Sequence, residues 1–180
     1  MSKIGRKPIE LLATKVEIKG QELLISGPKA KFTHTLPVEL KAKLVDGTLV
    51  IAPEKDAKEH AAMWGLHRAL VANKIMGARQ FFEKKVTIVG LGFKAQLSGK
   101  KMVFSLGYSH KIDFNIPVGV EVDVDKSGQQ LVFKSSDKLL LGNACDKVRS
   151  FRLPEPYKGT GIIVEGEVII RKAGKAKASA

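Results

Sequence analysis

The 180-residue sequence has a single cysteine, few aromatic residues and no long apolar run. One cysteine excludes an internal disulfide framework, which is typical of a cytoplasmic protein. No run approaches the ~20 apolar residues that a membrane-spanning helix needs, and the N-terminus lacks the apolar core of a signal peptide. We therefore expect a cytoplasmic location and no membrane association.

Acidic residues are also scarce relative to basic ones. Eighteen Asp and Glu stand against 31 Lys and Arg, so the formal net charge is +13. In a folded chain, this many positive charges repel one another, and such an excess usually serves the binding of a polyanion. Hydrophobic residues make up 44% of the chain, which is enough to bury a core. The composition predicts a globular protein that binds nucleic acid.

Motifs for catalysis are missing as well. The sequence has no Walker-type phosphate loop, and its four histidines show no metal-ligand spacing. Gly90, Gly92 and Ala95 imitate a dinucleotide fingerprint, but the residues after them alternate as a strand instead of opening a helix. We expect no cofactor, no small-molecule substrate and no enzyme activity, with a nucleotide-dependent oxidoreductase as the remote alternative. Cys145, beside Ala144 in a helical pattern, is expected to be a buried core thiol.

The chain contains an internal repeat. Three segments of the first half, at 25–29, 35–40 and 48–56, have similar counterparts in the second half. The counterparts lie in the same order at 97–101, 115–120 and 130–138. Each series leads into a helical pattern. Because the matches keep their order, they indicate a duplication.

Alternating apolar and polar residues, broken by turn residues, predict antiparallel strands in both halves. Hairpins are expected at 98–101 and around 109–110. Helices are predicted over 54–77 and 136–151. In the first, the apolar stripe expected to lie on the sheet is Met63, Leu66 and Leu70. In the second, it is Leu141, Ala144, Val148 and Phe151.

These patterns predict an α+β fold of two tandem duplicated modules, each an antiparallel β-sheet covered by one long α-helix. The expected boundaries are a basic N-terminal segment at 1–8, a first module at 9–82, a second module at 83–171 and a basic C-terminal tail at 172–180.

The segment LPEPYKGTG at 153–161 follows the second helix. Pro154 and Pro156 hold the residues before them in extended conformations, so the helix should end near Phe151. Gly159 and Gly161 would allow main-chain N–H groups to approach phosphate oxygens. The segment is predicted to be a stiff loop.

Two interpretations of Tyr157 in this loop stay open. Its ring either contacts RNA, by stacking on an unpaired base or donating its hydroxyl to a phosphate, or fills the gap between helix and sheet. The residues after the loop predict a hairpin about Glu165 and Gly166 that brings Arg171 and Lys172 to the tail. Four lysines would extend this surface or simply be solvated: Lys94, Lys100, Lys101 and Lys111.

Several segments resemble one known family in order along nearly the whole chain. They are SKIGRKPIE at 2–10, LPVEL at 36–40, KEH and RAL within 58–70, FEKKVTIVGLGFKAQLSGKK at 82–101, LGYSH at 106–110 and PEPYKGTGI at 154–162. Together they resemble the bacterial-type large-subunit ribosomal protein L6 family.

The resemblance implies a structural constituent of the large ribosomal subunit. Such a protein braces 23S rRNA near the sarcin–ricin region and the stalk base, mainly through its C-terminal domain, beside neighbouring large-subunit proteins. A free-standing RNA chaperone or translation regulator is the alternative. The predicted rRNA-binding residues are Arg152, Pro156, Tyr157, Lys158, Gly159, Thr160, Gly161, Arg171, Lys172, Lys175, Lys100, Lys101, Ser109 and His110.

The chain also departs from the family pattern. Thr160 stands where a lysine is usual, and Leu153 and Lys111 replace usual prolines. Ile163 and Val164 occupy the place of a common Arg-Tyr pair. Because the loop offers fewer cations, we expect Arg171, Lys172 and Lys175 to neutralise more of the phosphate charge.

Overall fold

The computed structural model describes residues 2–54 and 59–174. Within these residues the chain forms two helices and thirteen strands. Their bounds in chain order are β1 Ile9–Glu10, β2 Lys15–Lys19, β3 Glu22–Ser26, β4 Lys31–Thr35, β5 Leu40–Val45, β6 Thr48–Pro53, α1 Ala61–Arg79, β7 Phe82–Val89, β8 Lys94–Ser98, β9 Lys101–Ser105, β10 Ile112–Asn115, β11 Val120–Val124, β12 Gln130–Ser135, α2 Lys138–Ser150 and β13 Gly161–Val164.

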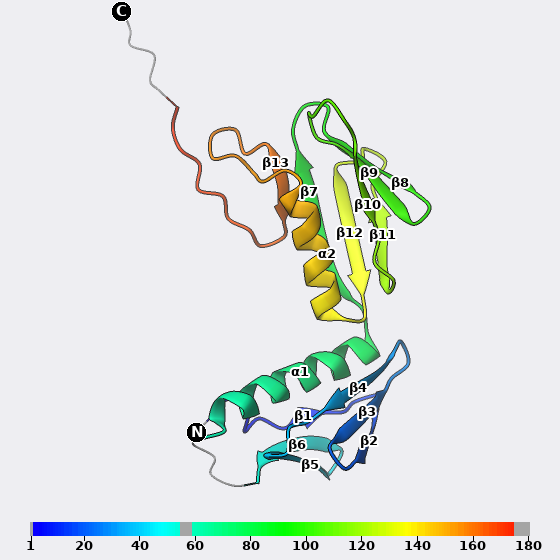
Figure 1. The fold of residues 1–180 in the computed structure, drawn as a ribbon, viewed down its shortest axis with the longest axis vertical. Coiled ribbons are helices and arrows are strands. Elements are labelled where there is room, and N and C mark those ends of the chain that lie inside the picture. The colour runs from blue at the N-terminus through cyan, green and yellow to red at the C-terminus, as the bar shows by residue number, and fades with distance from the viewer. Residues whose placement is uncertain (1, 55–58, 175–180) are drawn as a thin grey trace, which may run out of the picture. The chain divides into compact units, whose positions relative to one another are not determined.

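The chain divides into two compact units (Figure 1). The first unit takes in the residues up to Phe82 together with Ser136–Lys138, and the second takes in Glu83–Ser135 and the residues from Leu139 onward. Each unit has one helix and antiparallel strand pairs, so the predicted α+β fold is confirmed.

Each unit contains two sheets rather than one. The first unit has the sheets β2-β3-β4 and β1-β6-β5, and the second has β10-β9-β8 and β11-β12-β7-β13. A turn separates the sheets at the same place in both units, where the Leu40 N–H donates to the Pro37 carbonyl and the Val120 N–H to the Pro117 carbonyl. Proline has no N–H to continue a strand ladder, so the chain leaves one sheet and enters the other there. The shared turn supports the duplication.

The predicted buried face of the first helix is wrong. Met63, Leu66 and Leu70 are 43%, 50% and 39% exposed. Helix α1 instead buries Trp64, Val71, Ile75, Gly77 and Ala78. Both sets have helical spacing, so periodicity alone could not choose between them. The Trp64 indole N–H donates to the Ile51 carbonyl at 2.6 Å, and this bond orients the helix on its sheet.

The second helix buries the predicted face. Leu141, Ala144 and Val148 are buried in α2 together with Cys145. Phe151, just past the helix, has its ring 5.6 Å from that of Phe104 in the core. Burial raises the pKa of the Cys145 thiol to about 11, which makes it an unreactive core residue, as predicted.

The hairpin predicted about Glu165 and Gly166 is not formed. Strand β13 pairs with β7, with Ile162 opposite Ile88, and the residues after Gly166 form no strand within the described part of the chain. Gly90 and Gly92 lie in a turn with φ values of 154° and 75°, and strand β8 follows at Lys94. No helix begins there, which removes the structural basis of the dinucleotide motif. Neither helix in the described residues is long and apolar enough to cross a bilayer.

A histidine pair joins α1 to β4 in the first unit. His34, only 8% exposed, has Nε2 3.0 Å from His67 Nδ1. Burial lowers the pKa of His34 from 6.5 to about 4, and the charges of Lys74 and His67 add to this. His34 is therefore neutral in the folded protein at pH values where it is protonated in the unfolded chain.

We expect the first unit to lose stability as the pH falls from about 6.5 to 4, by up to roughly 3 kcal/mol from His34, because the unfolded chain binds the extra proton. Urea unfolding monitored by Trp64, the chain's single tryptophan, reports on this unit. The matched variant His34→Gln should show a shallower pH dependence over that range. An identical dependence in both proteins would contradict the assignment.

Candidate nucleic-acid interface

Three loops meet at one end of the second unit (Figure 1). They are residues 90–93 after β7, residues 106–111 between β9 and β10, and residues 151–160 between α2 and β13. The Tyr108 hydroxyl donates to the Phe151 carbonyl at 3.1 Å, which joins the second loop to the third. Gly161 lies opposite Val89, which places the third loop beside the first. We call these loops, with residues 171–174, the three-loop end.

The 151–160 loop is closed by its own hydrogen bonds. The Gly159 N–H donates to the Glu155 carbonyl at 3.1 Å, and the Glu155 N–H donates to the Thr160 carbonyl at 3.0 Å. This turn directs Tyr157 and Lys158 outward, and Tyr157 is 59% exposed. Tyr157 therefore does not fill the gap between helix and sheet, and the packing interpretation of this residue is wrong.

Thr160 has a structural role in the same loop. Its hydroxyl donates to the Glu155 carboxylate at 2.6 Å. A threonine at this position therefore closes the turn and gives the loop's one carboxylate an internal hydrogen-bond donor. The missing lysine removes a cation from this surface, but the loop keeps its own negative charge engaged in an internal hydrogen bond.

Gly161 permits close packing at the base of the loop. Its φ is +145°, and a Cβ there would lie 2.6 Å from Pro154 Cα and 2.7 Å from the Leu153 carbonyl oxygen. The N–H of the next residue, Ile162, donates to the Arg152 carbonyl. A side chain at 161 would push the two loop strands apart.

The C-terminal segment lies against this loop. The Lys172 N–H donates to the Pro156 carbonyl at 2.8 Å, and a Cβ on Gly159 would lie 3.1 Å from the Arg171 guanidinium. The structure therefore brings the loop and Arg171–Lys172 together, although the predicted hairpin is absent. Lys175, also predicted to bind rRNA, lies outside the described residues.

An ion pair holds the start of the C-terminal segment. The Arg149 guanidinium donates to both carboxylate oxygens of Glu167, with contacts of 2.6 to 3.0 Å. This hydrogen bonding holds the pKa of the Glu167 carboxyl below its ordinary range. A bidentate pair of this kind is geometrically specific, so it orients the chain that leads to Arg171.

The three-loop end is consequently rich in positive charge. Lys158, Arg171 and Lys172 are exposed, and Arg152 is half-buried. Ser109 and His110 are exposed in the second loop. Of the residues in the three loops and 171–174, only Glu155 is acidic. Clustered cations with one engaged carboxylate are chemically suited to phosphate groups.

Aromatic residues that the sequence analysis did not single out lie beside these cations. The Arg152 guanidinium carbon is 4.9 Å from the Tyr108 ring centroid and 5.9 Å from that of Phe93. The Tyr108 and His110 rings are stacked, 5.9 Å apart at 21°. The only signal in the sequence was the segment LGYSH, in which Ser109 and His110 were selected but Tyr108 was not.

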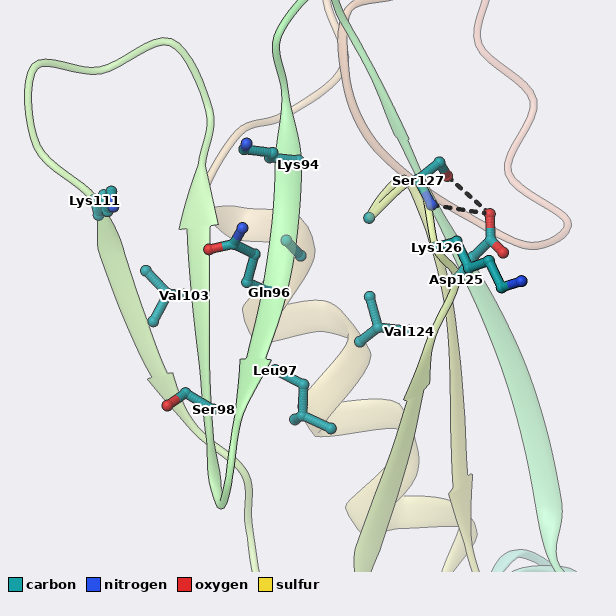
Figure 2. Close-up of a pocket in the computed structure, with 12 residues that line it drawn as sticks. Lys94, Gln96, Leu97, Ser98, Val103, Lys111, Val124, Asp125, Lys126 and Ser127 are labelled. Carbon is teal, nitrogen blue, oxygen red and sulfur yellow. Dashed lines mark hydrogen bonds between the residues drawn. The ribbon is translucent and has the colours of Figure 1, made fainter.

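Of Lys94, Lys100, Lys101 and Lys111, only Lys111 belongs to the three-loop end, as the last residue of the 106–111 loop. Lys100 lies in the β8–β9 turn and Lys101 is the first residue of β9, so roughly 16 Å of strand lies between Lys101 and the start of the 106–111 loop. Lys94 and Lys111 line a groove of about 760 Å³ with Gln96 and Val103 (Figure 2). The structure does not bring Lys100 and Lys101 into the three-loop end.

Comparisons with known proteins agree with this architecture. The family model described as ribosomal protein L6 matches residues 13–80 and 89–165, one segment in each unit. The chain is 44% identical over 176 residues to the large ribosomal subunit protein uL6 of Methylacidiphilum infernorum, covering 97% of this chain and 98% of that protein. Identity to the uL6 of Syntrophomonas wolfei is 45% over 177 residues, covering 98% of both chains. For the uL6 of Azorhizobium caulinodans it is 41% over 178 residues, covering 98% of this chain and all of that protein. The chain belongs to the ribosomal protein L6 family.

Proposed function

We propose that this chain is a structural protein of the large ribosomal subunit that binds 23S rRNA through the three-loop end. The observation that carries the proposal is the convergence of Arg152, Lys158, Arg171 and Lys172 on one end of the second unit. Its relatives are named as large ribosomal subunit proteins, and the family is one of ribosomal proteins rather than enzymes. The site of action is the ribosome in the cytoplasm.

The binding proceeds by phosphate contact and shape rather than by reading base edges. The 151–160 loop is stiff and internally hydrogen-bonded, so it presents Tyr157 and Lys158 with little ordering cost. The wider position of the protein is near the sarcin–ricin region and the stalk base, with other large-subunit proteins as neighbours. The resemblance of the segment at 154–162 to the family signature supports this position.

Sedimentation of a cell extract tests the assignment. The chain should travel with large subunits at low salt and dissociate as the salt concentration rises, because released counterions drive phosphate binding. Footprinting of the bound 23S rRNA then tests the position, with protection expected in the sarcin–ricin region. A chain that stays in the soluble fraction at low salt is not a subunit component, and would fit a free-standing RNA chaperone or translation regulator instead.

Replacing Lys158 by alanine should weaken binding to 23S rRNA and reduce the slope of log Kd against log salt by about one unit. The reason is that Lys158 is exposed at the tip of the loop, where it neutralises one phosphate. The matched control is Lys15→Ala, which removes an exposed lysine from a strand of the first unit. An unchanged slope for the Lys158 variant would mean that this side chain contacts no phosphate.

A further inference from the structure

The three-loop end carries an exposed apolar and aromatic surface beside its cations. Leu91 is fully exposed between two glycines of the first loop, and Tyr108 is 43% exposed in the second loop. His110, stacked on Tyr108, is exposed as well. We call Leu91, Tyr108 and His110 the platform. Leu91 therefore adds accessible apolar surface to this end of the second unit.

The platform rests on a rigid support. The Phe93 ring packs closely on Gly90 of its own loop and on Gly107 of the second loop, where a Cβ would lie 2.5 Å and 2.7 Å from the ring, respectively. The first and second loops therefore interlock around this ring. Both glycines have positive φ values, 154° and 77°, and these backbones let the loops close on Phe93.

Tyr108 is fixed in orientation while its ring stays accessible. Its hydroxyl donates to the Phe151 carbonyl, and Arg152 lies 4.9 Å from its ring centroid. Phe151 is itself held by ring contacts with Phe104 and Phe114 in the core. The hydroxyl proton is already used, so Tyr108 offers a ligand chiefly the exposed part of its ring that Arg152 and His110 leave uncovered. Preorganised aromatic surface of this kind binds at low entropic cost.

The surrounding charge identifies the class of ligand. The first two loops contain no acidic residue, and Glu155 in the third accepts the Thr160 hydroxyl. Arg152 lies over the Tyr108 ring, and Lys158, Arg171 and Lys172 add positive charge at the same end of the unit. A flat π surface with a guanidinium suits nucleobases, whose faces are accessible only where the bases are unpaired. A protein partner would need acidic groups to match these cations, whereas RNA supplies a phosphate with every base.

We propose that the platform stacks an unpaired RNA base, while Lys158, Arg171 and Lys172 hold phosphates next to it. This inference rests on the proposed function and makes it more specific, since the RNA bound at the three-loop end must present an unstacked nucleotide at the platform. Both tyrosines of the chain lie at this end.

The test uses the full-length chain and a 12-nucleotide oligouridylate with one central 2-aminopurine, whose fluorescence changes when it stacks. Leu91→Ser and His110→Ala are the variants, because both side chains are exposed and their removal should leave the melting temperature unchanged. Each variant should bind the oligonucleotide about tenfold more weakly and lose most of the fluorescence change. The salt slope should stay as in the unmodified chain, unlike that of Lys158→Ala.

A 12-base-pair RNA duplex separates this inference from the proposed function. If the chain binds 23S rRNA and the duplex but ignores the oligouridylate, and both variants bind 23S rRNA as the unmodified chain does, the platform proposal is wrong and rRNA binding stands. If the variants keep their rRNA affinity but detach from large subunits, the platform contacts a protein, and the stacking proposal is again wrong. Failure to bind 23S rRNA at all overturns the proposed function first.

Discussion

Simultaneous replacement of Lys158, Arg171 and Lys172 by alanine is expected to lower the affinity for 23S rRNA by on the order of 100-fold, if each charged contact contributes about 1 kcal/mol. The three side chains are exposed. The hydrogen bond from the Lys172 N–H to the Pro156 carbonyl keeps Arg171 and Lys172 beside the loop that carries Lys158. They can therefore contact neighbouring phosphates on one RNA surface.

The salt dependence makes this prediction sharper. Removing three phosphate contacts should reduce the slope of log Kd against log salt by about two to three units. The control is the triple variant of Lys15, Lys19 and Lys31, three exposed lysines on strands of the first unit. It loses the same net charge and should change the slope little. An equal loss of rRNA affinity in both triple variants would show that binding depends on the total charge of the chain and not on the cations of the three-loop end.

The stability of the second unit should fall by about 2–4 kcal/mol in the variant Gly161→Ala. The new methyl group would lie 2.6 Å from Pro154 Cα and 2.7 Å from the Leu153 carbonyl oxygen, so backbone rather than a flexible side chain must move. The φ of +145° adds strain for any residue with a Cβ. Because the displaced backbone belongs to the 151–160 loop, rRNA affinity should fall with stability.

Gly166→Ala is the matched control for this variant. Gly166 also has a positive φ, +86°, but a Cβ there has nothing within 4 Å. The Gly166→Ala variant should lose only about 1 kcal/mol of stability, from the strain of the positive φ alone. Hydrogen exchange of the Val86 and Ile88 amides in β7, the strand that pairs with β13, measures the stability of the second unit alone. Equal protection in the two variants would mean that the loop accommodates the methyl group without moving.

The two helices illustrate how far periodicity can predict burial. In α2 the apolar residues form one stripe, and Leu141, Ala144 and Val148 are buried as predicted. In α1 two apolar stripes with helical spacing compete, and the structure buries the one that contains Trp64 and Ala78. The buried stripe carries the indole hydrogen bond to Ile51, which lies 13 residues earlier in strand β6, and no local pattern reports this contact.

The candidate site shows a similar division. The stiff loop after α2, its prolines and its cations were predictable, because proline geometry and charge act locally. The predicted hairpin about Glu165 is wrong because β13 finds its partner in β7, more than 70 residues earlier. The place of Tyr108 in the site is evident only from its contacts with Phe151 and Arg152, which lie more than 40 residues later in the chain.

The sequence by itself determined the duplication, the α+β class, the strong positive charge and the end of the second helix. These properties follow from composition, order and local backbone chemistry. Only the tertiary structure decided which face of α1 is buried, that Thr160 closes its loop on Glu155, and which cations share one surface. Lys172 meets Pro156 there, while Lys100 and Lys101 lie a strand length from the 106–111 loop. The physical reason is that long-range strand pairing sets these distances, and local sequence does not encode which strands meet.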